Sequence, residues 1–291
     1  MADNWEDKYI EVDGVKTHYV EAGQGMPLVL IHGMGASACG DLSYGDVIPY
    51  LSKHFRVIAP DVIGFGLTPG RGPQDYTGKA QGDFLVKFMD LMDFNEIYLG
   101  GHSHGGFLVQ YVAHERPNLV KRLIIINSLN GTKPIPPEPE GLKYIYGPQG
   151  HSHPIPTLEN MKETMMKSYM RKQRITEDRI NKTYKISSLN HEFARAREIA
   201  IGSTIEDYNA NLSYKGKHIS EYAHELKMPV FLTWSRENDG SNVEDASRFL
   251  DRLKDGEMHV VVNALHSIQR DQSERFASTL IEWLKSERPS W

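Results

Sequence analysis

The sequence predicts an α/β fold: a mostly parallel central sheet flanked by helices, with a helical lid inserted after the sixth strand. Short apolar runs alternate with amphipathic segments along most of the chain, which is the order expected of right-handed βαβ units. Several runs are apolar at nearly every position, and this pattern is typical of a strand buried on both faces. Residues 131–226 depart from the alternation.

The strands are predicted in chain order from apolar runs and turn signals. Two strands, 8–12 and 16–21, flank Asp13-Gly14, a dipeptide typical of a tight hairpin. Apolar runs then predict strands at 27–31, 56–59, 96–99 and 121–126, and, after the interruption, at 229–234 and 258–262. Amphipathic segments predict helices at 44–52, 78–92, 106–115, 243–253 and 272–285.

The middle segment is predicted to be a helical lid. It begins with a proline-rich run, 134–139, that cannot pair as a central strand. It leaves the sheet at the carboxyl end of a strand, where parallel sheets bind their ligands, so we expect it to cover the substrate site. Its helices are expected at 157–172, 176–187 and 191–201. The expected domains are a core of residues 1–130 and 227–291 and a lid of residues 131–226.

The composition excludes several classes of protein. A single cysteine, Cys39, excludes an intramolecular disulfide framework and a multi-cysteine metal site. The formal net charge of −5 argues against a nucleic-acid partner, because phosphate binding relies on a basic surface. No segment approaches ~18 consecutive apolar residues and the acidic N-terminus lacks a signal sequence, so a cytoplasmic protein without a membrane span is expected. No metal and no cofactor are expected.

A nucleophile is predicted at Ser103. The segment Gly101-His102-Ser103-His104-Gly105 matches the G-x-S-x-G pattern, follows an apolar strand and opens a helix, as a nucleophile elbow does. The turn is strained, and a glycine two positions before and two after the serine relieves backbone crowding. The N-terminus of the helix presents unpaired N–H groups toward developing negative charge.

An oxyanion hole is predicted from an upstream turn, His32-Gly33-Met34-Gly35, at the end of the buried strand 27–31. Such a hole needs a free backbone N–H beside the nucleophile. We assign it to the N–H of Met34 or Gly35, together with the N–H of His104.

The general base is predicted at His266. In this fold order the histidine comes after the last strand, and His266 lies four residues beyond the run 258–262. The acid that orients it should follow the strand 229–234. The usual spacing places it at Asn238, which cannot carry the charge that stabilises an imidazolium. Asp239, one residue later, is the preferred candidate, and Glu237 is the second.

With these landmarks, nearly the whole chain resembles the α/β-hydrolase superfamily. Within it, the chain is most similar to the meta-cleavage product hydrolases, which split carbon–carbon bonds in ring-fission products of aromatic degradation. The stretches that carry this resemblance are 134–144, 156–160, 174–178 and 233–237. The resemblance implies an α/β-hydrolase fold and a serine-dependent hydrolase of a carbon–carbon bond.

The sequence departs from this subfamily at three positions. His102 stands where Asn usually precedes the nucleophile, and Ser267 where Trp usually follows the histidine. The subfamily holds the substrate carboxylate with a lid arginine, and Thr183 aligns with it. Arg179, Arg195 or Arg197 could take its place. These departures put the usual dienoate substrate in doubt and leave hydrolysis intact.

Four functions remain open from the sequence. The first is hydrolysis of a carbon–carbon bond in a ring-cleavage-type diketone, and the second is carboxylesterase or lactonase activity. The run His102 to Gly106 also resembles that of cofactor-free ring-cleaving dioxygenases on the same fold, which is the third. The fourth is a catalytically silent binding protein. The expected partner is a small apolar or aromatic-derived substrate, and a homodimer stays open.

Overall fold

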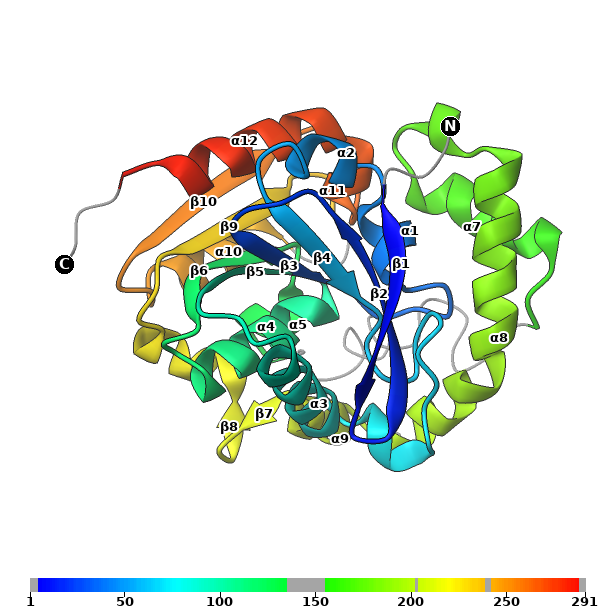
Figure 1. The fold of residues 1–291 in the computed structure, drawn as a ribbon, viewed down its shortest axis with the longest axis horizontal. Helices are drawn as coiled ribbons and strands as arrows, with labels where there is room; N and C mark the ends of the chain where they lie inside the picture. The colour runs from blue at the N-terminus through cyan, green and yellow to red at the C-terminus, as the bar shows by residue number, and fades with distance from the viewer. Residues whose placement is uncertain (1–4, 135–154, 202–203, 239–241, 288–291) are drawn as a thin grey trace.

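Eight strands form one sheet in the order β1-β2-β4-β3-β5-β6-β9-β10 (Figure 1). The computed structural model describes residues 5–134, 155–201, 204–238 and 242–287, with the backbone alone for 192–199 and 201. The strands are β1 (Glu6–Val12), β2 (Val15–Ala22), β3 (Pro27–Ile31), β4 (Arg56–Pro60), β5 (Ile97–His102), β6 (Val120–Ile126), β9 (Val230–Ser235) and β10 (Gly256–Val261). Only β2 pairs antiparallel with its neighbours, so the predicted mostly parallel sheet is confirmed.

Helices cover both faces of this sheet (Figure 1). Leu28 and Leu30 of β3 pack in one apolar cluster with α2 (Ile48–Leu51) and α12 (Ser273–Lys285). Val29 and Ile31 pack in the other, with α3 (Gly78–Leu91) and α4 (His104–Glu115). Successive side chains of a strand point to opposite faces, so a strand buried on both sides must be apolar throughout. This is the pattern from which the strand was predicted.

The predicted helix 44–52 is wrong in its extent, because two short helices occupy the region. They are α1 (Gly40–Tyr44) and α2 (Ile48–Leu51). Pro49 lies in the first turn of α2. Proline fits the first turn of a helix but clashes with the carbonyl four residues before it, so a continuous helix cannot run through this point.

Helices fill the segment between β6 and β9, as predicted. They are α5 (Leu129–Thr132), α7 (Leu158–Ser168), η2 (Lys172–Arg174), α8 (Glu177–Ile201), α9 (Ile205–Asn211) and η3 (Ile219–Glu225), with a two-stranded hairpin, β7 (Ser213–Tyr214) and β8 (Lys217–His218). Most of the proline-rich run lies outside the described residues. After the segment come α10 (Val243–Leu250) and α11 (Ile268–Asp271).

The predicted pair of helices, 176–187 and 191–201, is one continuous helix, α8. Asn190, near the expected break, does not turn its side chain onto its own backbone. Its amide lies 3.3 Å from the Ala36 carbonyl and 3.4 Å from the Gly66 carbonyl, both in loops of the core. An asparagine that bonds away from its own helix does not compete with the helical hydrogen bonds.

Ion pairs attach this segment to the core. Asp46, between α1 and α2, accepts both Arg174, at 3.0 Å, and Arg179, at 2.8 Å. We call these two residues the lid arginines, after the lid that the sequence predicts at residues 131–226. A third pair joins Lys182 to Asp41. Because Asp46 bridges two cations, η2 and α8 are held to the same point of the core.

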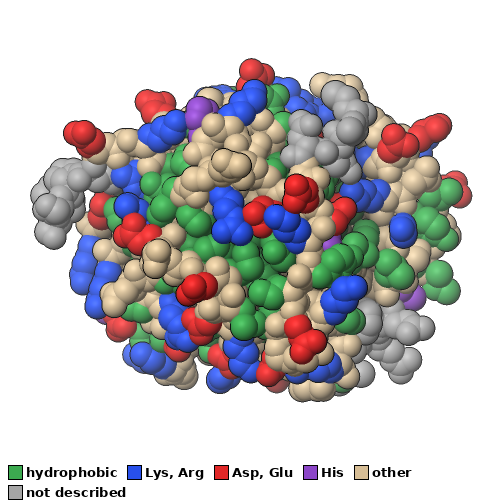
Figure 2. All heavy atoms as spheres, in the orientation of Figure 1, with side chains coloured by type: hydrophobic (Ala, Val, Ile, Leu, Met, Phe, Trp, Pro, Cys, Tyr) green, Lys and Arg blue, Asp and Glu red, His purple; other side chains and the backbone are tan. Residues whose placement is uncertain are grey.

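The face shown in Figure 2 carries charges of both signs, interspersed around apolar side chains. No large area of a single sign gathers on this face. Among the helices in the described ranges, none is both long and apolar enough to cross a membrane.

Candidate active site

Ser103 lies in a sharp turn between β5 and α4. Its backbone has φ 55° and ψ −121°, a conformation that L residues rarely adopt. Three hydrogen bonds fix it. The Ser103 N–H donates to the Ile126 carbonyl at 2.9 Å, and the Ser103 carbonyl accepts from Gly106 N–H at 2.9 Å and Ser128 Oγ at 2.5 Å. The surrounding backbone therefore holds the serine in the strained geometry of a nucleophile elbow.

Glycines make this turn sterically feasible, as the sequence predicted. A Cβ on Gly101 would collide with the Gly105 carbonyl, and one on Gly105 would collide with the end of β3. Gly33 approaches the elbow from the other side, and a Cβ there would lie 3.0 Å from Ser103 Cβ. The turn after β3 and the elbow are thus in contact, as an oxyanion hole requires.

The ring of His32 fixes the peptide between Gly33 and Met34. Its Nε2 accepts from Val62 N–H at 3.0 Å, so the proton is on Nδ1, which donates to the Gly33 carbonyl at 2.7 Å. Burial lowers the pKa of His32, in keeping with this neutral form. Because C=O and N–H point in opposite directions across a trans peptide, Met34 N–H points away from the His32 ring. Within the described residues, neither Met34 nor Gly35 donates its N–H to another backbone group.

His104, the first residue of α4, contributes the other predicted N–H, at the N-terminus of the helix. Its side chain is fixed by contacts with α3 and α4. Nε2 lies 2.7 Å from Gln81 Oε1 of α3, and the ring stacks on Phe107 at 5.6 Å between centroids. The side chain is thus held among α3 and α4, while the backbone stays beside the elbow.

The structure brings His266 to the elbow. The His266 carbonyl accepts from His102 Nε2 at 2.9 Å and from Asn127 Nδ2 at 2.8 Å. The rings of His102 and His266 lie 4.6 Å apart, centroid to centroid. His102, adjacent to Ser103 and placed by prediction at the substrate site, therefore positions the backbone of the predicted base.

Asn127, Ser235 and Asp271 were not predicted and hold the loop that carries His266. Asn127 Nδ2 lies 3.0 Å from Ser235 Oγ, and Ser235 N–H donates to Asn127 Oδ1 at 2.9 Å. Ser235 Oγ donates to the Leu265 carbonyl at 2.7 Å, and Leu265 N–H donates to Asp271 Oδ2 at 3.0 Å. The first two residues stand at the carboxyl ends of β6 and β9, a position that could have marked them.

His266 is neutral over most of the pH range. Burial, and then the charge of Arg270, lower its pKa to about 4. Burial, and then His266, hold the pKa of His102 well below its usual value. A neutral imidazole can accept a proton from a nearby hydroxyl, which is what a general base for Ser103 must do.

The predicted acid, Asp239, lies outside the described residues. The alternatives precede it: Glu237 Oε2 and Asn238 Nδ2 are buried, and neither makes a hydrogen bond in the described part of the chain. No carboxylate in that part bonds to the ring of His266. The identity of the acid therefore stays a prediction.

The structure describes the side chain of only one of the three arginines that could replace the carboxylate-binding lid arginine of the subfamily, namely Arg179. Arg179 is paired with Asp46 and lies 3.4 Å from the Tyr169 hydroxyl. Thr183, at the aligned position, is buried and uncharged. The side chains of Arg195 and Arg197 lie outside the described residues.

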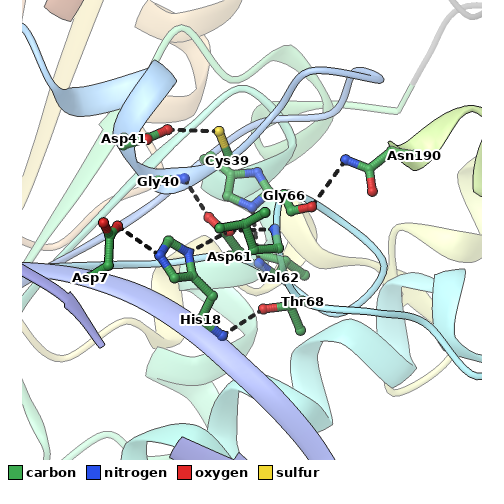
Figure 3. Close-up of polar contacts among 12 residues, drawn as sticks. Asp7, His18, Cys39, Gly40, Asp41, Asp61, Val62, Gly66, Thr68 and Asn190 are labelled. Carbon is green, nitrogen blue, oxygen red and sulfur yellow. Dashed lines mark hydrogen bonds and ion pairs between the residues drawn. The ribbon is translucent and has the colours of Figure 1, made fainter. Parts of the chain in front are cut away.

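A second polar network is centred on Asp61 and His18 (Figure 3). Asp61, at the end of β4, accepts Gly40 N–H at 2.7 Å through Oδ1 and Leu67 N–H at 2.8 Å through Oδ2. His18 Nδ1 lies 2.8 Å from the same Oδ2, and its Nε2 lies 3.0 Å from Asp7. Asp61 thereby connects β2 to two loops.

Among the described residues, no group of three or more His, Cys, Asp or Glu side chains is arranged to hold a metal ion.

Comparisons with known proteins agree with this geometry. The family model of the alpha/beta hydrolase fold matches residues 26–272. A 2-hydroxy-6-oxo-6-(2'-aminophenyl)hexa-2,4-dienoic acid hydrolase of Metapseudomonas resinovorans is 27% identical over 96% of this chain and 90% of its own length. A 2-hydroxy-6-oxo-2,4-heptadienoate hydrolase of Pseudomonas putida is 24% identical over 94% of each chain.

Solved structures show the same likeness. A serine hydrolase involved in carbazole degradation superposes with a TM-score of 0.78 at 25% identity, covering 96% of this chain and 98% of its own. The resemblance to meta-cleavage product hydrolases, predicted from short stretches of sequence, is thus confirmed over nearly the whole chain.

Proposed function

Because the chain belongs to the α/β-hydrolase fold family, we propose that it hydrolyses a carbon–carbon bond in a ring-cleavage-type 2-hydroxy-6-oxo-dienoate. Ser103 is the nucleophile and His266 is the base. The observation that supports this most directly is the strained backbone of Ser103. Beside it lies the loop of His266, whose carbonyl accepts hydrogen bonds from His102 and Asn127. The relatives' names supply the substrate class.

The reaction uses the geometry in three steps. The dienol first becomes the keto form, which makes the departing fragment a stabilised carbanion. Ser103, or a water activated by His266, then adds to the remote carbonyl, and the N–H groups of Met34 or Gly35 and of His104 stabilise the oxyanion. The carbon–carbon bond then breaks, and the carbanion takes from His266 the proton that His266 removed from the nucleophile. If water attacked, this step yields the acid directly. If Ser103 attacked, it leaves an acyl-serine, and one water hydrolyses this ester to release the acid and restore Ser103.

Three further assignments belong to this proposal. Asp239 orients His266, with Glu237 as the second candidate. Residues 131–226 form a lid over the substrate, which is supported by the ion pairs of Asp46. The active protein is a homodimer, a proposal that sedimentation of the purified chain tests directly.

Incubation with a yellow meta-cleavage product, under air and under nitrogen, tests the function. We expect equal loss of colour in both atmospheres and a loss of at least about 10³-fold in Ser103→Ala. Ser278→Ala, a change on the exposed face of α12, is the matched control and should leave the rate unchanged. Dependence on oxygen, or full activity in Ser103→Ala, would refute the proposal. A p-nitrophenyl ester as a second substrate separates carbon–carbon cleavage from esterase activity.

A further inference from the structure

Arg270 lies one helical turn beyond His266, on α11. Its guanidinium carbon is 3.5 Å from the centre of the Tyr169 ring, and one terminal nitrogen donates to the Ser168 carbonyl at 2.5 Å. Its Nε is buried and makes no hydrogen bond within the described part of the chain. The contact with Tyr169 fixes the plane of the guanidinium, and the Nε–H donor remains without an acceptor among the described residues.

This cation has no carboxylate partner within ion-pair distance among the described residues. The lid arginines, in contrast, share Asp46. Asp271, the neighbour of Arg270, forms no ion pair with it, because its oxygens accept from Met170 N–H at 3.0 Å and Leu265 N–H at 3.0 Å. Burial lowers the pKa of Arg270 and outweighs Tyr169 and the charge of Asp271, which raise it. A buried cation that is not held in an ion pair is unfavourable, so its environment favours the arrival of an anion.

Arg270 lies on the segment that holds the predicted base. Asp271, the next residue, accepts from the N–H of Leu265, which directly precedes His266, at 3.0 Å. The charge of Arg270 also lowers the pKa of His266, after burial, and acts on the pKa of His102. The guanidinium therefore belongs to the same short segment as the base and acts on it electrostatically.

We propose that Arg270 is the anion subsite of the active site and binds the carboxylate of the substrate. This rests on the function proposed above and deepens it. A guanidinium presents parallel N–H donors that match the two oxygens of a carboxylate, and Nε–H with a terminal N–H can form such a pair. The subsite selects acids over neutral molecules of the same shape, and it orients the reacting carbonyl toward Ser103.

The direct test requires no substitution. The rate of p-nitrophenyl acetate hydrolysis by the wild-type protein is measured with added benzoate or benzamide, which have similar shapes and differ in charge. We expect benzoate to inhibit competitively, with an inhibition constant roughly 10- to 100-fold lower than that of benzamide. Equal inhibition by the two molecules would overturn the proposal.

Two substitutions locate the effect. Arg270→Gln should raise KM for a dienoate substrate roughly 10- to 100-fold, with a smaller effect on kcat, and abolish the preference for benzoate. Arg270→Lys keeps the charge but loses the parallel N–H donors of the guanidinium, so its affinity for benzoate should lie between those of the wild type and Arg270→Gln. Arg174→Gln is the matched control, because it removes an arginine of the lid that Asp46 already neutralises, and it should retain the preference.

The outcomes separate the two proposals. If the dienoate is cleaved and Arg270→Gln leaves its KM and the benzoate preference unchanged, the subsite is wrong and the hydrolase function stands. If the dienoate is not cleaved but benzoate inhibits ester hydrolysis through Arg270, the function is wrong and the anion subsite stands. Circular dichroism checks that each variant is folded, and the benzoate comparison on wild-type protein does not depend on that result.

Discussion

Asn127 offers a test of how the catalytic loop is held. Its side chain, fully buried at the end of β6, lies within hydrogen-bond distance of Ser235 Oγ, Ser235 N–H and the His266 carbonyl, at 3.0, 2.9 and 2.8 Å. In Asn127→Ala the Ser235 N–H becomes an unsatisfied buried donor, whereas the His266 carbonyl keeps His102. A buried unsatisfied donor costs about 1–3 kcal/mol, and each lost hydrogen bond costs about 1 kcal/mol.

The backbone adds a second contribution. Asn127 has φ 42°, where alanine is less favourable than glycine or asparagine by about 1 kcal/mol. We therefore expect Asn127→Ala to lower the free energy of unfolding by about 4–6 kcal/mol and Asn127→Gly by about 1 kcal/mol less. The difference between the two variants isolates the backbone strain.

Urea unfolding measures both values, and ester hydrolysis at a temperature where each variant is folded measures the effect on the site. In Asn127→Ala the His266 carbonyl has lost one of its two donors, so we expect the turnover rate of this variant to fall about 10²-fold. If Asn127→Ala loses stability but keeps the wild-type kcat/KM, the hydrogen bonds of Asn127 do not position His266, and this reasoning is refuted.

Three other predictions follow from the same structure. The pKa of about 4 for His266 places the acid limb of kcat/KM near pH 4, and a limb near 6.5 would instead indicate a carboxylate on its ring, which raises the pKa. Burial opposes the charged ring of His18, but Asp61 and Asp7 outweigh it and raise its pKa above 6.5. Its stabilising contribution is therefore complete below pH 6.5 and lost as pH rises through the raised pKa, and thermal unfolding of His18→Asn should lack this dependence. Asp46→Asn leaves the two lid arginines unpaired, so it should lower stability by about 2 kcal/mol and speed limited proteolysis of α8, and unchanged cleavage would contradict the anchoring role.

Much of the sheet could be predicted from the sequence because burial on both faces leaves little choice of residue. The run Pro27–Ile31 is apolar for that reason, and the tight hairpin requires Asp13 and Gly14 at positive φ, 54° and 76°. The elbow could be predicted because its strain demands glycines at fixed spacing from Ser103. These features are local, so a short window of sequence contains their cause.

The rest depends on contacts between distant segments. Asn127 and Ser235 are 108 residues apart and meet only because β6 and β9 are neighbours in the sheet. Arg270 forms no ion pair within the described residues, and no window of sequence shows which carboxylates will lie near it. The prediction of a helix break near Asn190 was wrong for the same reason, because the side chain of Asn190 bonds to loops that are far away in the sequence.

The neighbouring positions of β6 and β9 also bear on how this protein can change over evolution. The chain leaves the sheet after Ile126 and returns on the adjacent strand, where Ile126 pairs with Thr233. The two ends of the insertion therefore meet whatever lies between them, and doubling the length of a flexible connection adds only about 0.6 kcal/mol of closure entropy. The chain between β6 and β9 can therefore change in length without separating the two strands that position the elbow and the histidine loop. If this segment covers the substrate, as proposed above, new substrate ranges can arise by its exchange, provided that its contacts with Arg270 and Asp271 are kept.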